Sequence, residues 1–578
     1  MRYAVRRVAL IVVLAVASCS SSHRRSLPSD WDLVPTTGDR VSSRSVVIVA
    51  DNQLHDVYSE PAELIRTGLA DRYVSVAIRP PALDLFGQDF LALVLELSPK
   101  TPVVHLGDGA NISARDEFTS FLRIMARAGR GWFLAPGNHD GFFFGNEHLD
   151  PRKSRWADTT AKSGGPLTKS MAVRLYLAAL AHRPEHAELR DALGIDGPSD
   201  GEEVVAYATR VEPSIRAEGR ADGADGFLRA IAWSIDDEKP WTSWVVQWVD
   251  LTNVDVKAGA ILIDTAAYRS RPALLPSPFG VNAGLSGDLL DGQAAAARRW
   301  VDGAPDQAWV LMGHHPYDAL TRGGRAALDA LRLAARARLY VSAHTHAGRS
   351  IVHARPDDER GADLDDPEAW LELNVGSILD YPQEYATLRC IRVTEAGSGE
   401  RRGFSWSRTS IVDLLEERSG AVDWKAWLPK PNEPDAALRY ARRRDLDSIA
   451  AESDVKNGLL ALHARLIRLF ATDEDRVAEW PRDPATGVRL DSTERVLGHV
   501  DSLLGDGTPL AAKGAFLAEL RRFEESRPLR PATGGEADPA KMREVFRRQL
   551  AYTASWYEVN ELRLPLPDGS TVIFPADR

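Results

Sequence analysis

Residues 45–56 read SVVIVADNQLHD, in which a run of β-branched residues is followed by a close group of polar ones. The run Val46–Val49 predicts a short buried strand, because β-branched side chains favour extended backbone and apolar runs of this length are typical of buried strands. A turn would explain the Asp and Asn of the polar group, but it has no need of Gln53 and His55. A metal site would explain the whole group, because carboxylate, amide and imidazole side chains all bind metal ions. The stretch alone leaves both interpretations open.

The composition is that of an ordinary globular protein. The chain has 578 residues, of which 44% are hydrophobic and 26% are charged. This length exceeds one domain of usual size, although a large α/β enzyme with insertions could include most of it. The formal net charge of −11 argues against general nucleic-acid binding, which normally requires a basic face. A local basic pocket for an anionic substrate stays compatible with this charge.

The first residues have the pattern of a bacterial export signal. A charged start is followed by an apolar run over residues 8–17, which is too short to span a bilayer. Residues 16–19, VASC, resemble a lipobox, which implies a signal peptide over residues 1–19 and a lipid on Cys19. We therefore expect a lipoprotein of the outer membrane or cell surface that faces the periplasm or the exterior, with residues 20–44 as a polar tether. A plain secretory signal is the alternative.

Beyond the tether, strand-like and helix-like stretches alternate, and this alternation favours an α/β domain. Strands are expected at residues 45–50, 101–106, 131–135, 244–251, 260–264, 309–312, 339–342, 370–374 and 385–393. Helices are expected at residues 83–97, 115–128, 294–301 and 324–337. Residues 141–240 are charged with a helical pattern and are expected to form a helical insertion. Residues 411–578 predict a mainly helical C-terminal region.

Polar clusters follow five of the expected strands, at the point where each strand ends. They are DNQLH (51–55), GDGAN (107–111), GNHD (137–140), GHHP (313–316) and AHTH (343–346). Each cluster alone has an ordinary explanation, because Gly-Asp and Gly-Asn pairs are common in turns. Ligands and catalytic groups in α/β sheets gather at the C-terminal ends of strands, so the five clusters could converge on one crevice. Their combination favours a shared metal site.

The ordered series D-x-[HQ], G-D, G-N-H-[DE], H-x-P and G-H-x-H resembles the calcineurin-like metallophosphoesterases over about residues 45–395. The G-N-H-D and H-x-H elements are the specific ones. The resemblance implies a two-sheet α/β/β/α sandwich and a pair of divalent metal ions bridged by one carboxylate. The metal ligands that it implies are Asp51 and His346 for the first ion, Asn138, His314 and His344 for the second, and Asp108 as the bridge.

Two positions depart from the family pattern. Gln53 stands where the family usually has His, and we expect it to be a weak ligand of the first ion, with His55 as the alternative. Ala343 stands where Gly is usual, which is a small change. Imidazole suits Zn, Fe or Mn, whereas carboxylate and amide oxygens suit harder ions such as Mg, so the identity of the two ions stays open.

The resemblance also implies the catalytic groups. His139 would protonate the leaving oxygen or stabilise the phosphoryl charge, and Asp140 would orient it. His315 could contact substrate or only pack beside Pro316. His105 is expected in the core or behind the ligands, and the turn at residues 374–377 is expected to be structural.

These features together predict an exported, membrane-tethered enzyme. It would hydrolyse a phosphate mono- or diester by a metal-activated hydroxide, because two metal ions can clamp a phosphate and lower the pKa of a water. One alternative is a non-catalytic metal-binding surface scaffold, which Gln53 favours. Another is a hydrolase of lipid or sugar pyrophosphates of the cell envelope. The sequence does not identify the natural substrate.

Overall fold

The computed structural model describes ten parts of the chain. They are residues 39–54, 90–128, 131–141, 164–223, 226–271, 286–346, 348–353, 370–379, 384–395 and 399–410. The expected signal peptide, His55, and the expected C-terminal region lie outside the described residues. Within the described parts, every helix is too short or too polar to span a bilayer.

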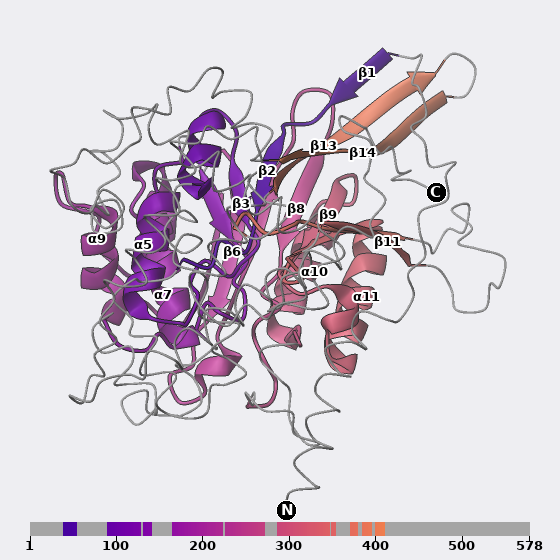
Figure 1. The fold of residues 1–578 in the computed structure, drawn as a ribbon. Coiled ribbons are helices and arrows are strands. Elements are labelled where there is room, and N and C mark those ends of the chain that lie inside the picture. The colour runs from indigo at the N-terminus through magenta and orange to yellow at the C-terminus, as the bar shows by residue number, and fades with distance from the viewer. Residues whose placement is uncertain are drawn as a thin grey trace, which may run out of the picture.

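Two mixed sheets form the centre of the molecule (Figure 1). The strands of the first sheet are β1 (Asp39–Ser42), β2 (Val46–Val49), β3 (Val103–His105), β4 (Trp132–Leu134), β13 (Glu384–Glu395) and β14 (Gly399–Ser410). Its order is β1-β13-β2-β3-β4, with β14 paired to β13. Strands β2, β3 and β4 are parallel, whereas β13 is antiparallel to β1, β2 and β14.

The second sheet has eight strands in the order β11-β12-β10-β9-β8-β7-β6-β5. Their bounds are β5 Glu218–Asp222, β6 Leu228–Ser234, β7 Trp244–Asp250, β8 Ala258–Leu262, β9 Ala308–Met312, β10 Leu339–Ser342, β11 Arg349–His353 and β12 Trp370–Asn374. Strands β8, β9, β10 and β12 are parallel, and the other pairs are antiparallel. In both sheets the parallel strands therefore end at one edge, where loops can approach each other.

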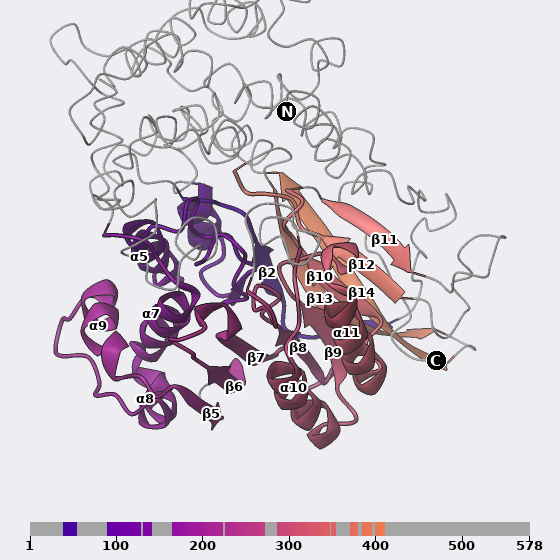
Figure 2. The same ribbon diagram turned by 90° about the horizontal axis from the view of Figure 1, so that it is seen from below.

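Two groups of helices flank the sheets. Their bounds are α5 Arg115–Met125, α7 Lys169–Ala181, α8 Ala187–Leu193, α9 Val204–Val211, α10 Asp291–Gly303 and α11 Arg322–Ala335. Residues 90–97 are also helical, and short 3₁₀ turns lie at Pro184–His186, Glu212–Ser214, Pro240–Thr242 and Tyr317–Ala319. Figures 1 and 2 show α5, α7 and α9 on one side of the molecule and α10 with α11 on another.

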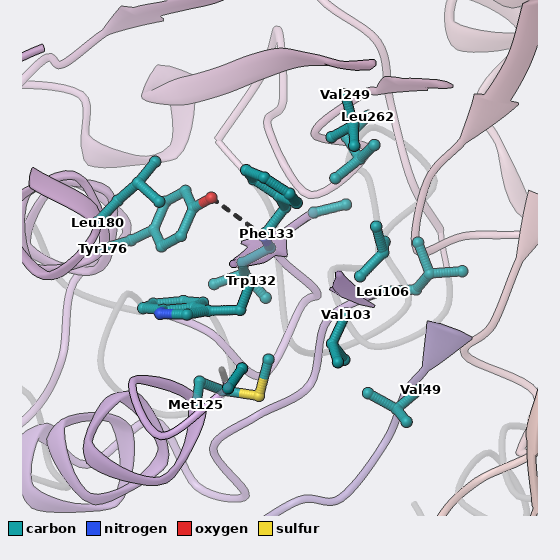
Figure 3. Packing of buried hydrophobic residues seen from close by; sticks show 14 of the residues in the cluster. Val49, Val103, Leu106, Met125, Trp132, Phe133, Tyr176, Leu180, Val249 and Leu262 are labelled. Atoms are coloured by element: carbon teal, nitrogen blue, oxygen red, sulfur yellow. Dashed lines mark hydrogen bonds between the residues drawn. The ribbon is translucent and has the colours of Figure 1, made fainter. Parts of the chain in front are cut away.

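Alternation along the strands explains why both faces of the sheets are buried. In β4, Trp132 points toward Met125 and Tyr176, whereas Phe133 points toward Val249 and Leu262 of the second sheet (Figure 3). Strand β8 alternates in the same way: Ala258, Ala260 and Leu262 belong to the cluster between the sheets, and Ile261 packs with α10 and α11. The period of two in side-chain direction thus produces two apolar faces per sheet. The architecture is mixed α/β and compatible with a two-sheet α/β sandwich.

Two buried polar side chains of the α7 helix, Tyr176 and Lys169, join it to the sheets. The Tyr176 hydroxyl accepts a hydrogen bond from the backbone N–H of Leu134 at 3.1 Å and donates to the side chain of Gln247. At the start of α7, the Lys169 ammonium lies 2.9 Å from Asp264 Oδ1, and both side chains are fully buried. A buried ion pair of this kind is costly to break, because removing one partner leaves the other charged group without compensation. These contacts fix α7 and β4 relative to the second sheet.

Most expected strands and helices agree with the structure, but the range expected to be a helical insertion does not. Residues 169–211 do contain α7, α8 and α9, but Glu218–Asp222 and Leu228–Ser234 are strands β5 and β6. The helical prediction is therefore wrong over these two stretches. The sequence of β5, EGRAD, has no alternation of apolar residues, and its extended backbone depends on antiparallel pairing with β6.

The ordered fold also extends beyond residues 45–395 at both ends. Strand β1 lies inside the range expected to be a tether and pairs with residues 391–394 of β13. Strand β14 pairs with β13 along its full length, from Gly399 to Ser410. Both strands are rich in polar residues, so their local sequence does not indicate a strand. Hydrogen bonds to β13 stabilise their extended backbone instead.

Candidate metal centre

The five polar clusters follow β2, β3, β4, β9 and β10, and the described residues of all five lie close together. Hydrogen bonds between distant segments show this directly. His314 Nδ1 lies 2.7 Å from the backbone carbonyl of Leu106, which joins the end of β9 to the end of β3. The backbone N–H of His344 donates to Asp51 Oδ2 at 3.1 Å, which joins β10 to β2. The C-terminal ends of strands from both sheets therefore meet at one place, as the sequence predicted.

The closest group of atoms surrounds Nε2 of His314. This nitrogen lies 3.1 Å from Asn138 Oδ1, 3.1 Å from His344 Nδ1 and 3.3 Å from Asp108 Oδ2. Because a carbonyl oxygen can only accept, the hydrogen on His314 Nδ1 is donated to Leu106, and a neutral ring then has a lone pair at Nε2. Asn138 Oδ1, Asp108 Oδ2 and, in the tautomer with its hydrogen on Nε2, His344 Nδ1 also have lone pairs, and a cation at this place would bind all four atoms.

The electrostatics of His314 indicate the same preference. Burial disfavours a charge on this ring, but the carboxylates of Asp108 and Asp51 and the carbonyl of Leu106 together outweigh burial and raise the pKa of His314 to about 9. In turn, although burial opposes ionisation of Asp108, His314 and His139 hold the pKa of Asp108 well below its usual range. The site therefore favours a positive charge between these groups, which a proton or a metal ion can supply.

A second group of atoms lies around Asp51. The Asp51 carboxylate is fully buried, and its Oδ1 has no hydrogen-bond partner among the described residues. His346 Nε2 lies 3.6 Å from this oxygen. Burial raises the pKa of Asp51 to about 6, so nearby groups compensate its negative charge only in part. A buried carboxylate oxygen without a partner is rare in proteins and fits a place for a cation.

Gln53 lies between Asp108 and His346. Its Nε2 is 3.4 Å from Asp108 Oδ2 and 3.2 Å from His346 Nε2. Rotation of the amide by half a turn would place its oxygen at this position, and this oxygen is the atom that binds metals. Gln53 is therefore in reach of the first group of ligands. His55 lies outside the described residues.

The backbone at these positions is unusual. Positive φ angles, which only glycine adopts easily, occur at 53° in Asp51, 37° in Gln53, 58° in Asp108, 66° in His344 and 55° in His346. Each such residue costs on the order of 1–3 kcal/mol, and such strain is concentrated at functional sites. The loops are held in this form by tertiary hydrogen bonds, such as that from the Ser377 hydroxyl to the Asp51 carbonyl at 2.8 Å. The turn at residues 374–377 is therefore structural, as expected.

Asp140 organises the loops through their backbone. Its carboxylate accepts hydrogen bonds from the backbone N–H groups of Asp108 (2.9 Å), Gly109 (2.9 Å), Ala110 (3.1 Å) and Gly137 (2.9 Å). Burial raises the pKa of Asp140 to about 6, with the Asp108 carboxylate as a further cause. The carboxylate fixes the loop that contains Asp108 against the loop that contains Asn138.

The orientation of His139 has a different source from the one expected. Its Nδ1 donates a hydrogen bond to the backbone carbonyl of Asn111, and its backbone N–H donates to Asp108 Oδ1 at 2.8 Å. Its Nε2 lies 3.8 Å from Asp108 Oδ2, beside the group of ligands. The expectation that Asp140 orients the His139 ring is corrected: Asp140 holds the loops, and the carbonyl of Asn111 holds the ring.

His105 and His315 are both fully buried but differ in their contacts. His105 has partners on both ring nitrogens, Asn52 Oδ1 at 2.7 Å and the backbone N–H of Gly107 at 3.1 Å, so it is a structural residue, as expected. His315 lies beside His314 and His344, with ring centroids 4.8 and 4.6 Å away. From the sequence, its role stayed open between contact with substrate and packing beside Pro316.

Among the described residues, two groups of side chains could hold a metal ion, and all their members are buried except His344, which is half-buried. They are Asp51 with Asp108 and His314, and His314 with His315 and His344; within each group one ligand atom per residue lies within 4.8 Å of the others. All the expected ligands that the structure describes are thus in or beside these groups. No protein-family model and no curated protein matches the chain.

Proposed function

We propose that this protein is a metal-dependent phosphoesterase that hydrolyses a phosphate mono- or diester, as its resemblance to the calcineurin-like metallophosphoesterases implies. The observation that supports this most strongly is the convergence on His314 Nε2. Asn138 Oδ1, His344 Nδ1 and Asp108 Oδ2 all lie within 3.3 Å of it, so three further potential ligand atoms surround one buried imidazole nitrogen. Such a set of nitrogen and oxygen donors fits a divalent cation.

The donors suit two ions that share Asp108. Oδ2 of Asp108 lies 3.3 Å from His314 Nε2 on one side and 3.4 Å from Gln53 Nε2 on the other. The first ion would be held by Asp51, His346 and Gln53, and the second by Asn138, His314 and His344. The Asp51 oxygen without a partner fits the first ion, since a cation would compensate its buried charge.

Two divalent ions bound by these residues would neutralise the charge of a phosphate and lower the pKa of a nearby water. The chain's own residues supply the remaining functions. His139 is fixed by the carbonyl of Asn111, and its Nε2 lies on the side of Asp108 Oδ2. Because Nδ1 carries the hydrogen donated to Asn111, His139 can donate a proton from Nε2 only in its charged form. Burial lowers the pKa of His139, so the negative charge of a bound phosphate is needed to favour that form.

The resemblance also implies a finer fold and a place in the cell. The sandwich of two sheets would be that of the metallophosphoesterases, with the insertion expected at about residues 141–240 added to it. The protein would be exported and anchored by the lipid on Cys19, and it would face the periplasm or the exterior. The residues of the signal and the tether up to residue 38 lie outside the described part of the chain.

A non-catalytic metal-binding scaffold is the second candidate, and Gln53 is the observation that favours it. An amide binds metals more weakly than the imidazole that the family usually has there. The hydrogen bonds that fix His139 favour the enzyme, since a scaffold has no need of a positioned proton donor.

The test is a metal analysis combined with a substrate panel. The full-length chain is loaded separately with Mn, Zn, Fe and Mg and assayed on p-nitrophenyl phosphate, its bis ester, nucleotides, and lipid and sugar pyrophosphates. The enzyme predicts about two ions per chain and turnover of at least one ester. Bound ions without any turnover would favour the scaffold, and turnover confined to pyrophosphates would favour the cell-envelope hydrolase. A chain that binds none of these ions would contradict the proposal.

A further inference from the structure

His315 is a fully buried histidine whose ring is held in place from several sides. Its Nδ1 lies 3.0 Å from the Thr265 hydroxyl, which also accepts the backbone N–H of His315 at 2.9 Å. Its carbonyl accepts a hydrogen bond from the Tyr340 hydroxyl at 2.6 Å. The backbone of Gly287 packs against the ring so closely that a Cβ there would lie 2.5 Å from Cγ of His315. These contacts keep the ring buried beside His314 and His344 and prevent it from turning toward solvent.

The other ring nitrogen of His315, Nε2, is buried and has no hydrogen-bond partner among the described residues. Buried polar atoms in folded proteins nearly always have a partner, and one that lacks a partner requires an explanation. The comparison with His105 is informative, because that equally buried histidine has partners on both nitrogens. A bound ion at Nε2 would explain this difference between the two histidines, and the groups around His315 indicate which kind of ion.

The nearest functional groups are two of the proposed metal ligands. One ring nitrogen from each of His314, His315 and His344 lies within 4.8 Å of the others. His314 Nε2 and His344 Nδ1 are 3.1 Å apart, which is close to the separation of two nitrogens that bind one ion at about 2.0–2.1 Å and at a right angle. Two ligands of one ion can be at most about 4.2 Å apart at this bond length, so His315 needs only a small shift to join them.

We propose that His315 is a third imidazole ligand of the second metal site, beside His314 and His344. Thr265 would accept the hydrogen of Nδ1 and so leave the lone pair of Nε2 available, as hydrogen bonds behind metal ligands commonly do. This inference rests on the proposed function, because it assumes that the second ion exists. With His315 the second site has three imidazoles, so it should prefer Zn²⁺ or Co²⁺ to Mg²⁺. The first site differs, because it has one imidazole and mainly oxygen donors.

The first experiment needs no substitution. The full-length chain is loaded with one equivalent of Zn²⁺, and X-ray absorption spectroscopy counts the imidazole ligands around the ion. Three imidazoles are expected, and a count of two with the ion in the tighter site would overturn the proposal. A wild-type chain that binds no Zn²⁺ would contradict the proposed function itself.

The second experiment compares His315→Ala with His182→Ala by Zn²⁺ titration against a competing chelator and by the visible spectrum of bound Co²⁺. His182 is a suitable control, because its Nε2 bonds to the carbonyl of Glu202 at 2.7 Å and not to any proposed ligand. We expect His315→Ala to lower Zn²⁺ affinity about 100-fold and to change the Co²⁺ spectrum, and Thr265→Val to lower affinity about 10-fold, as lost second-layer partners do. His182→Ala should change neither.

The folded state of each variant is checked by thermal unfolding in the presence of a chelator. A folded His315→Ala that keeps Zn²⁺ affinity within threefold of wild type, with an unchanged Co²⁺ spectrum, would overturn the role of His315 while leaving the two-ion proposal intact. If His315→Ala does not fold, Thr265→Val and the ligand count of the wild-type chain still decide the question.

Discussion

The two halves of the candidate metal centre share Asp108 but are built differently. In the half formed by Asn138, His314 and His344, the ligand atoms lie within 3.3 Å of one nitrogen, and His314 is fixed by the carbonyl of Leu106. In the half formed by Asp51, Gln53 and His346, the nearest oxygen of Asp51 is 3.6 Å from His346 and has no hydrogen-bond partner among the described residues.

The fold therefore prepares the two halves for an ion unequally. Ligands that are already close and oriented lose little conformational entropy when an ion binds, so preorganisation strengthens binding. The half around His314 should therefore hold its ion more tightly. In the half around Asp51, the buried carboxylate is poorly compensated and therefore attracts a cation. The amide of Gln53 nevertheless replaces one of the imidazoles usual in the family, which weakens binding of the ion. We expect one firmly bound ion and one that exchanges readily.

The largest effect is expected from Asp108, the residue common to both halves. Asp108→Ala removes the carboxylate whose Oδ2 lies 3.3 Å from His314 Nε2 and 3.4 Å from Gln53 Nε2, so both ions should be lost and turnover should disappear. Elemental analysis of the purified variant measures this directly, and Asp108→Asn serves as a control that keeps the side-chain volume. Retention of both ions in Asp108→Ala would contradict the shared role.

His139 should affect catalysis without affecting either ion. Its ring is held by the carbonyl of Asn111 and lies beside the ligands, with Nε2 3.8 Å from Asp108 Oδ2. We expect His139→Ala to bind two ions and to lose about 10²–10⁴-fold in turnover, the usual contribution of a general acid. Steady-state rates at saturating metal test this, with His182→Ala as a control. Rates close to wild type would remove His139 from the mechanism.

The sequence predicted those features of this site that depend on the type of side chain, namely the strands and the loops that contain the ligands. Apolar runs marked β2, β3, β9 and β10, and polar clusters of Asp, Asn and His marked the loops that follow them. The partners of His139 and His314 could not be predicted, because both are backbone carbonyls, those of Asn111 and Leu106, which any residue can supply. The role of Asp140 was misjudged for the same reason, since all its partners in the loops are backbone N–H groups.

The fold shows a similar limit. Strand β5 has the sequence EGRAD, and β1 has DRVS, so neither has an apolar alternation that a local pattern could reveal. Both are extended because a neighbouring strand supplies hydrogen bonds, β6 in one case and β13 in the other. Pairing of this kind depends on tertiary structure, and single-sequence patterns do not record it.

Removing one ligand from each half compares the halves directly. His314→Ala should lose the firmly bound ion, because it deletes the nitrogen on which the other ligands converge. His346→Ala should lose only the exchangeable ion and keep the other. Titration of each variant with Zn²⁺ and Mn²⁺, followed by elemental analysis after dialysis, distinguishes the two. Equal losses in both variants would mean that the two halves bind their ions as one cooperative unit.

Asp140→Asn should weaken both halves slightly and lower stability more clearly. The N–H₂ group of the new amide would face backbone N–H groups, which cannot accept its hydrogens, so buried hydrogen bonds to a charged acceptor are lost. The free energy of unfolding should fall by about 3 kcal/mol. Asp236→Asn is a matched control, because Asp236 Oδ1 accepts two backbone N–H groups in a loop between β6 and β7. Chemical denaturation should show a loss of stability in both variants, whereas metal affinity should fall only in Asp140→Asn. An unchanged metal affinity there would limit Asp140 to a structural role.

The smallest effect is expected from Gln53→His, which restores the imidazole that the family usually has at this position. Gln53 is 2% exposed and its Nε2 lies 3.2 Å from His346 Nε2, so a ring of similar reach would point toward the same ion. Because imidazole is the stronger ligand for Zn and Mn, the exchangeable ion should bind about 10-fold more tightly, and the two halves should become more alike. Competition titration of the exchangeable ion, which binds as the second equivalent of metal, measures this affinity. Gln53→Ala should instead weaken the binding of that ion. If Gln53→Ala binds the second equivalent as wild type does, Gln53 is no ligand, and the first ion depends on Asp51, His346 and Asp108, with His55 as the remaining candidate.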